Sequence, residues 1–259
     1  MKKLVFAAVA CGALAMSAGG LAAKEWTKVR IGTEGAYPPF NYIDPNGQVQ
    51  GFEIELAQAM CAAMQVECEF VVQDWDGIIP GLLAKKYDAI IASLYITDER
   101  REKMDFSQKY YQTPARFVVP KGTMLDISEQ GLSGKSIAVQ RGTAFERFLR
   151  DTYPKVDLRV YATQDEVNMD LVAGRIDAML ADTVAASEGF LNTPEGQGFE
   201  FVGPDFSDPK WFGYGAGVAT RKDDPELNQL FNAAIDKIRA DGTYQRISAK
   251  FFPFDVYGQ

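Results

Sequence analysis

One phrase of helix followed by strand occurs twice in this chain, and it restricts the possible folds more than any other feature. Residues 82–93, LLAKKYDAIIAS, and residues 171–182, LVAGRIDAMLAD, each place a basic residue near a helix end and an aspartate before an apolar strand. Strands that alternate with helices in this way form parallel sheets with right-handed crossovers. The repeat therefore predicts two similar α/β lobes rather than one long sheet.

Hydrophobic periodicity places the individual elements. In the first lobe the prediction is strands and helices in alternation: strand 28–33, helix 51–66, strand 68–73, helix 75–87 and strand 88–94. In the second lobe it is a strand, a turn and a helix within 135–154, then strand 156–163, helix 164–175 and strand 176–183. The tail from residue 225 to 252 reads as one or two amphipathic helices.

Two stretches connect the lobes. Residues 110–122 are extended and lead from the first lobe to the second, and residues 201–224 lead back. Two crossings form a hinge, and ligands in such folds bind in the crevice at the carboxyl ends of the strands. The predicted bounds are lobe I at 24–111 and 212–259, lobe II at 116–206, and hinge segments at 112–115 and 207–211.

The first 23 residues have the pattern of a cleaved signal peptide. Lys2 and Lys3 precede the apolar run LVFAAVACGALAM, and small residues surround the expected cleavage after Ala23. The apolar run is too short for a membrane span, so we expect an exported, soluble protein in the periplasm. An alternative interpretation makes Cys11 a lipid-attachment site.

Charge and cysteine content exclude several classes of partner. Without Lys2 and Lys3 the chain keeps 25 of its 27 basic residues against 35 acidic ones, which argues against nucleic acid as a partner. In an exported chain Cys61 and Cys68 predict a disulfide, with two buried free thiols as the alternative. The chain has no histidine, so we expect neither a metal site nor a cofactor.

The predicted strand ends carry residue types that suit a ligand crevice. The candidates from the residues alone are Glu34, Tyr37, Trp75, Ser93, Leu94, Tyr95, Arg100, Gln140, Thr143 and Asp182. Arg100 suits a carboxylate, and the capping pattern from Thr143 to Glu146 leaves a helix start that favours an anion. Asp182 could bind an ammonium group, and the aromatic residues could form flat walls around a ligand whose distal positive charge Glu34 meets.

Each of these residues also has a purely structural interpretation. Arg100 could be a solvated helix charge, Asp182 and Thr143 could be helix caps, and Tyr37 and Trp75 could be core aromatics. Convergence on one crevice is what favours the binding interpretation.

Several motifs resemble one family. The stretches RIGTEGAYPPF, GFEIELAQAMC, WDGIIPGLLAKKYDAIIASLYITDERR, FSQKYY, GRIDAMLADTVAASEGFL and DGTYQRISAKFFPFDVYG are similar to the periplasmic solute-binding proteins for polar amino acids, most closely the lysine/arginine/ornithine- and histidine-binding type. The resemblance covers essentially the whole mature chain. It implies a type II two-lobe clamshell that closes on one amino acid and delivers it to an ABC permease, commonly as a monomer.

The resemblance also implies a role for each matching residue. Arg100 would hold the α-carboxylate with backbone groups near Ser93 and Thr143, and Asp182 would hold the α-ammonium. Tyr37 and Trp75 would stack on the side chain, and Glu34 would lie near its tip. The family disulfide matches Cys61 and Cys68. The expected ligand is arginine, ornithine or lysine.

The sequence departs from the family pattern at several of these positions. Glu34 stands where aspartate is usual, Ala92 and Tyr95 stand where small polar residues are usual, and Phe145 replaces a polar residue. Gln140 and Arg141 stand where an apolar residue and a glutamine are common. Glu34 with Ala92 is similar to the opine-binding branch, so an opine or another derivative is the second hypothesis. The third is an enzyme like the cyclohexadienyl dehydratases of the same fold, which we do not expect in a chain without histidine.

Overall fold

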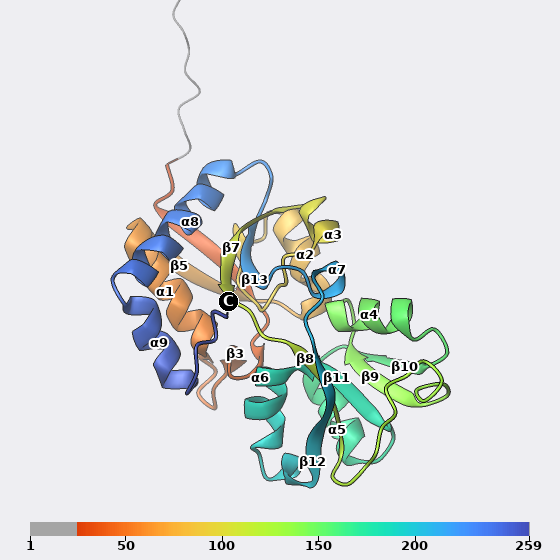
Figure 1. Cartoon of the computed structure of the whole chain (residues 1–259). Coiled ribbons are helices and arrows are strands. Elements are labelled where there is room, and N and C mark those ends of the chain that lie inside the picture. Colours follow the sequence, from red (N-terminus) through yellow and green to blue (C-terminus); the bar gives the residue numbers. More distant parts are fainter. Residues whose placement is uncertain (1–24, 259) are drawn as a thin grey trace, which may run out of the picture.

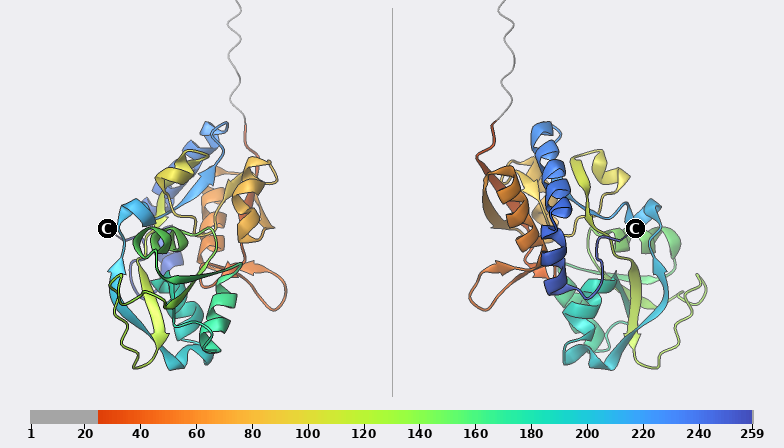
Figure 2. Two further views of the ribbon diagram at one scale, coloured as in Figure 1. Left: turned by 90° about the vertical axis from the view of Figure 1, so that its right-hand side faces the viewer. Right: turned by 60° about the vertical axis from the view of Figure 1, so that its left-hand side comes forward.

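The structure, a computed structural model, describes residues 25–258. The predicted signal peptide, with Cys11 inside it, lies outside the described residues. The described chain forms two α/β lobes, one above the other in Figure 1 and seen from two further sides in Figure 2. The two-lobe prediction is therefore confirmed.

The first lobe is built on a five-stranded sheet in the order β5-β1-β6-β13-β7. Its first three strands are parallel, and β13 is antiparallel to both of its neighbours. The strand bounds are β1 Lys28–Thr33, β5 Glu67–Val72, β6 Ala89–Ile90, β7 Asp105–Tyr111 and β13 Ala216–Thr220. The return of the chain to this sheet at β13 agrees with the predicted second crossing.

The second lobe has the corresponding sheet in the order β10-β9-β11-β8-β12. Strands β10, β9 and β11 are parallel, as the repeated helix–strand phrase predicts. Strand β8 is antiparallel to both of its neighbours, β11 and β12. The bounds are β8 Ala115–Pro120, β9 Ser136–Gln140, β10 Asp157–Tyr161, β11 Ala178–Asp182 and β12 Phe199–Phe206. The chain leaves the first sheet after β7 and returns after β12; the hinge ranges 112–115 and 207–211 and the lobe bounds stay predictions.

Helices pack against both sheets (Figure 1). In the first lobe they are α1 Phe52–Met64, α2 Trp75–Leu83, α3 Asp98–Arg101, α8 Pro225–Ala240 and α9 Thr243–Phe251. The others are α4 Ala144–Thr152, α5 Gln164–Val172, α6 Thr183–Ala186, a π-helix Ser187–Leu191, a 3-10 helix Glu195–Gly198 and α7 Pro209–Phe212. The predicted helix 51–66 is shorter because Gln65 adopts a left-handed conformation with φ 61°.

Several short elements were not predicted, and one of them is a small sheet beside the first strand. The segment between the first strand and the first helix forms a small antiparallel sheet of β2 Ala36–Tyr37, β3 Asn41–Ile43 and β4 Val49–Gln50. Its strands have two or three residues, too few for alternation of side chains to be recognised in a sequence. This sheet fixes the backbone that follows β1 at the boundary between the lobes.

Cys61 in α1 and Cys68 in β5 form a disulfide, with their Cα atoms 6.1 Å apart, so that prediction is confirmed. Because the bond closes a short loop, its reduction is expected to lower the free energy of unfolding by about 2–3 kcal/mol. Urea unfolding with and without reductant measures this difference. A Cys61→Ala/Cys68→Ala double variant, which reductant cannot affect, is the control. An unchanged midpoint of the wild type under reductant would contradict the expectation.

No helix in the part of the chain that the structure describes is both long and apolar enough to span a bilayer.

Candidate ligand-binding site

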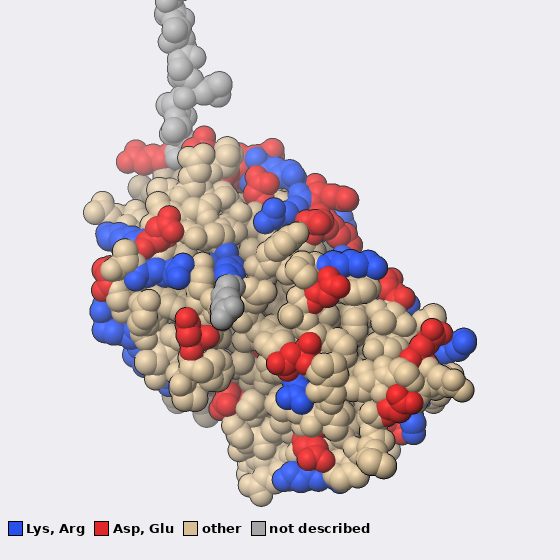
Figure 3. All heavy atoms as spheres, viewed as in Figure 1, with Lys and Arg blue, Asp and Glu red and all other residues tan. Residues whose placement is uncertain are grey.

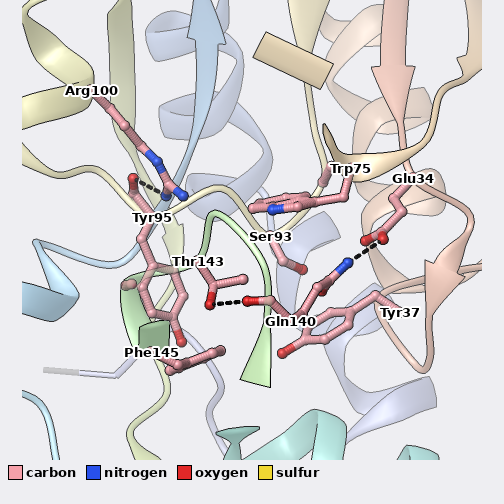
Figure 4. Close-up of a pocket in the computed structure, with 11 residues that line it drawn as sticks. Glu34, Tyr37, Trp75, Ser93, Tyr95, Arg100, Gln140, Thr143 and Phe145 are labelled. Carbon is pink, nitrogen blue, oxygen red and sulfur yellow. Dashed lines mark hydrogen bonds between the residues drawn. The ribbon is translucent and has the colours of Figure 1, made fainter. Parts of the chain in front are cut away.

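A pocket lies where the two lobes meet (Figure 4). The lining residues come from both lobes: Glu34, Tyr37, Trp75, Ala92, Ser93, Tyr95 and Arg100 from the first, and Gln140, Thr143, Ala144 and Phe145 from the second. All but two of the predicted site residues line this pocket. The two exceptions are Leu94 and Asp182.

Arg100 provides the positive charge of the pocket. Its Nη1 donates to the carbonyl oxygen of Tyr95 at 3.0 Å, and its Nη2 donates to the carbonyl oxygen of Gly142 at 3.2 Å. The guanidinium also lies 5.8 Å from the ring centre of Trp75. Burial lowers the pKa of Arg100 to about 10, so the group stays protonated at neutral pH. Because both hydrogen-bond acceptors are uncharged carbonyls, the guanidinium is suited to pairing with an anionic ligand.

Glu34 provides the negative charge. It follows β1, is 7% exposed, and its Oε1 accepts a hydrogen bond from Nε2 of Gln140 at 2.6 Å. Burial raises the pKa of Glu34 to about 7, although the bond from Gln140 acts in the opposite direction. The cost of burying this carboxylate would fall if a cation bound beside it. Figure 4 places Glu34 and Arg100 at opposite sides of the pocket.

The raised pKa of Glu34 leads us to predict how the free energy of unfolding of the ligand-free protein depends on pH. Between pH 4.5, its ordinary pKa, and pH 7 the folded state binds more protons than the unfolded state. The free energy of unfolding should therefore fall as the pH rises through this window, by up to about 3 kcal/mol from this group. The measurement is urea unfolding of wild type and Glu34→Gln at several pH values. Parallel curves for the two proteins would contradict the expectation.

Aromatic rings and a helix start complete the pocket. Tyr37 in β2 is 7% exposed, and Trp75 is the first residue of α2. Thr143 caps α4, since its Oγ1 accepts from the backbone nitrogen of Glu146 at 3.3 Å. The predicted capping box is only half formed, because the Glu146 carboxylate accepts from the nitrogen of Gly142, at 2.7 Å, rather than from Thr143.

Asp182 lies behind the pocket wall and is 1% exposed. Its Oδ1 accepts from the backbone nitrogens of Val184 and Ala185 at 2.8 and 3.0 Å, so it caps α6. Its Oδ2 accepts from the hydroxyls of Tyr95, at 2.9 Å, and Thr113. Burial raises the pKa of Asp182, and these donors act in the opposite direction. The structure therefore does not bring this carboxylate to the pocket lining.

Leu94 also points away from the pocket. Its side chain is fully buried in a hydrophobic cluster with Ile78 and Leu82 of α2, and its carbonyl oxygen accepts from Gly217 at 3.2 Å. Its neighbours Ser93 and Tyr95 both line the pocket, so Leu94 is the residue of this turn that faces the lobe I core.

Sequence reasoning named neither Ala144, which lines the pocket, nor Glu53, which supports its wall. Glu53 of α1 is fully buried and accepts hydrogen bonds from Asn41, at 2.7 Å, from the backbone nitrogen of Ser93, at 2.6 Å, and from Tyr110. The bond to Ser93 supports a left-handed backbone with φ 54°, which is costly for a residue other than glycine. The sequence contains one signal for this role. Glu53 lies one helical turn before the apolar Leu56, so it is an acidic residue on the face of α1 that is expected to be buried.

Comparison with known proteins places this geometry in a family. The family model of bacterial extracellular solute-binding proteins, family 3, matches residues 29–254. The chain is 48% identical to an L-arginine-binding protein of Pseudomonas aeruginosa, over 100% of this chain and 99% of that one. It is 45% identical to the lysine/arginine/ornithine-binding periplasmic protein of Escherichia coli, over the full length of both.

A solved structure agrees with these sequence relatives. A periplasmic binding protein of Salmonella typhimurium, described as having high arginine specificity, superposes with a TM-score of 0.79 at 33% identity. The match covers 87% of this chain and 99% of that protein. With its two lobes, the pocket between them and a match over nearly all of the described residues, the chain belongs to the bacterial extracellular solute-binding proteins of family 3.

Proposed function

We propose that this protein is the periplasmic receptor of an ABC importer and that it binds a cationic L-amino acid, namely arginine, ornithine or lysine. The observation that carries the proposal is the pair of opposite charges in one pocket, Arg100 on one side and Glu34 on the other. A carboxylate on Arg100 and a cationic side chain reaching Glu34 would satisfy both groups. Curated relatives named for arginine, lysine and ornithine support the same ligand class.

The remaining lining residues have roles that follow from their chemistry. Tyr37 and Trp75 would hold the aliphatic stem and the cationic end of the ligand between their rings. Ser93 and Thr143 would contribute polar groups around the carboxylate. Ala92 and Gln140 would set the width of the pocket and the position of Glu34. The lobes would close on the ligand through the two predicted hinge segments, and the permease would recognise the closed form.

Transport also sets the expected location and partners. The signal peptide pattern at 1–23 supports export to the periplasm, as the names of relatives do for those proteins. We propose a monomer that binds without changing its ligand, and incubation with arginine should return arginine unaltered. Acidic and basic side chains are interspersed on the face shown in Figure 3, and the excess of acidic residues disfavours nucleic acid as a partner.

An opine or another amino acid derivative is the second candidate. Glu34, Ala92 and Gln140 all line the pocket, and Ala92 leaves room where a larger side chain would not. Tyr95 and Phe145 argue against a bulkier ligand. Their rings pack edge to face with centres 5.9 Å apart and occupy volume on the lobe II side of the pocket.

Calorimetric titration of the refolded, ligand-free protein separates the candidates. The panel is arginine, ornithine, lysine, histidine, glutamine and octopine. Sub-micromolar binding of at least one of arginine, ornithine and lysine is expected. No heat with any of these three would overturn the proposal, and a response to octopine alone would move the assignment to the derivative-binding candidate.

A further inference from the structure

The acceptor sites of Asp182 are fully used by the protein itself. An ionised carboxylate has about four lone-pair positions, and Asp182 accepts from Val184, Ala185, Tyr95 and Thr113. The residue is 1% exposed and does not belong to the pocket lining. A ligand ammonium could reach this carboxylate only by displacing a hydroxyl donor.

Tyr95 occupies the space through which such an ammonium would approach. Its side chain is 6% exposed, extends from the first lobe to Asp182 in the second, and packs against Phe145. Its carbonyl oxygen accepts from Arg100 at 3.0 Å. In an α-amino acid the ammonium is attached one carbon from the carboxylate. A carboxylate on Arg100 would therefore place that ammonium in the neighbourhood of Tyr95, whose phenol already donates to Asp182.

The charges that remain in the lining do not provide a second site for a cation. Among the residues that line the pocket, Arg100 is the basic one and Glu34 the acidic one. They lie at opposite sides of the pocket (Figure 4). A pocket with one fixed charge of each sign matches a ligand that carries one carboxylate and one distant cation. Arginine, ornithine and lysine carry a second cation, the α-ammonium, for which no lining carboxylate remains.

We propose that Tyr95 substitutes for the ligand α-ammonium at Asp182, so that the pocket recognises ω-guanidino and ω-amino carboxylates without needing an α-ammonium. This inference rests on the proposed receptor function and on the roles given to Arg100 and Glu34. It predicts that δ-guanidinovalerate, which is arginine without its α-amino group, binds within about fivefold of arginine or more tightly. The matched pair for lysine is ε-aminocaproate.

Calorimetry on the ligand-free protein tests the inference with both pairs. The dissociation constant of δ-guanidinovalerate is expected to lie within about fivefold of that of arginine or below it. A buried ammonium–carboxylate contact would instead make the loss at least about 100-fold. If arginine binds and δ-guanidinovalerate is weaker by that factor, the inference is overturned while the proposed function stands. If neither compound of either pair binds, the proposed function fails, and the inference that rests on it fails too.

Two substitutions at Tyr95 assign the effect to this residue. Tyr95→Ser removes the ring and exposes Asp182 to the pocket. The affinity for arginine should therefore rise by at least about 30-fold relative to the affinity for δ-guanidinovalerate. Tyr95→Phe removes the hydroxyl that donates to Asp182 but keeps the ring over the carboxylate, so the ratio should move in the same direction as in Tyr95→Ser and by a smaller factor. An unchanged ratio in Tyr95→Ser, in protein whose circular dichroism and melting are those of a folded chain, would overturn the inference.

A third variant keeps the test available if Tyr95→Ser does not fold. Asp182→Asn keeps the side-chain oxygen that caps α6, and the hydroxyls of Tyr95 and Thr113 can rotate to accept from its amide. Since Asp182 touches no ligand in this proposal, arginine affinity should change by less than about fivefold. A loss of about 100-fold or more would show a direct ammonium contact and overturn the inference.

Discussion

Replacing Arg100 by alanine is expected to abolish ligand binding, because the ligand carboxylate would enter the pocket without its counter-charge. Truncating one partner of a buried, hydrogen-bonded ion pair costs about 3–5 kcal/mol, or roughly two to four orders of magnitude in the dissociation constant. The guanidinium is already fixed by the carbonyls of Tyr95 and Gly142, so its loss also removes a preorganised group. Calorimetric titration with arginine measures the effect.

The next residue in the chain provides a matched control. Arg101 is exposed and lies 5.7 Å from the ring centre of Tyr214, outside the pocket lining. Arg101→Ala should bind arginine as the wild type does. Arg100→Lys keeps the charge but loses the planar fork, so it should fall between wild type and Arg100→Ala. Residual affinity of Arg100→Ala within about tenfold of wild type would refute the role given to Arg100.

Replacing Glu34 by glutamine is expected to weaken arginine binding by about 30-fold or more, because a desolvated carboxylate no longer meets the cationic end of the ligand. Citrulline, the neutral analogue of arginine with nearly the same shape, should change by less than about fivefold. The measurement is the ratio of the two dissociation constants in wild type and variant. If both ligands weaken alike, Glu34 does not read the charge of the side chain.

If Glu34 binds the cationic end of the ligand, its pKa predicts how the affinity for arginine depends on pH. Burial raises this pKa to about 7 without ligand, and a bound cation would lower it, so binding below pH 7 must release a proton. Arginine affinity should therefore fall as the pH decreases through this range, by up to about tenfold per pH unit. Arginine keeps its guanidinium charge throughout, and in Glu34→Gln the dependence should disappear.

The sequence predicts the parallel strands of both sheets well because their signal is local, whereas β7, β8, β12 and β13 fall wholly or partly in stretches that it treats as connections. The helix–strand phrases that end at Ser93 and Asp182 each contain enough apolar and turn residues to place one α/β unit. The disulfide follows from the spacing of Cys61 and Cys68 in an exported chain. The short sheet β2-β3-β4 has strands too brief for any periodicity, and its pairing depends on the packing around it.

The candidate site is harder to predict because side-chain partners are set by three-dimensional contacts. The positions of Arg100 and Glu34 at the pocket follow from strand ends, which the topology brings together. The partners of Asp182 do not, since Tyr95 and Thr113 are distant from it in the sequence. An aspartate after a strand is equally typical of a ligand-binding residue and of a helix cap. Only the structure shows that the acceptor sites of Asp182 are used by groups of the protein itself.

The lobes are joined by their own side chains across the pocket. Gln140 donates to Glu34, Tyr95 donates to Asp182, and at the rim Arg141 pairs with Asp76 at 2.7 Å. We expect these contacts to separate before a ligand enters between the lobes. The rate of ligand entry at high concentration should then be limited by how often the protein opens, a property of the empty receptor rather than of the molecule that it carries.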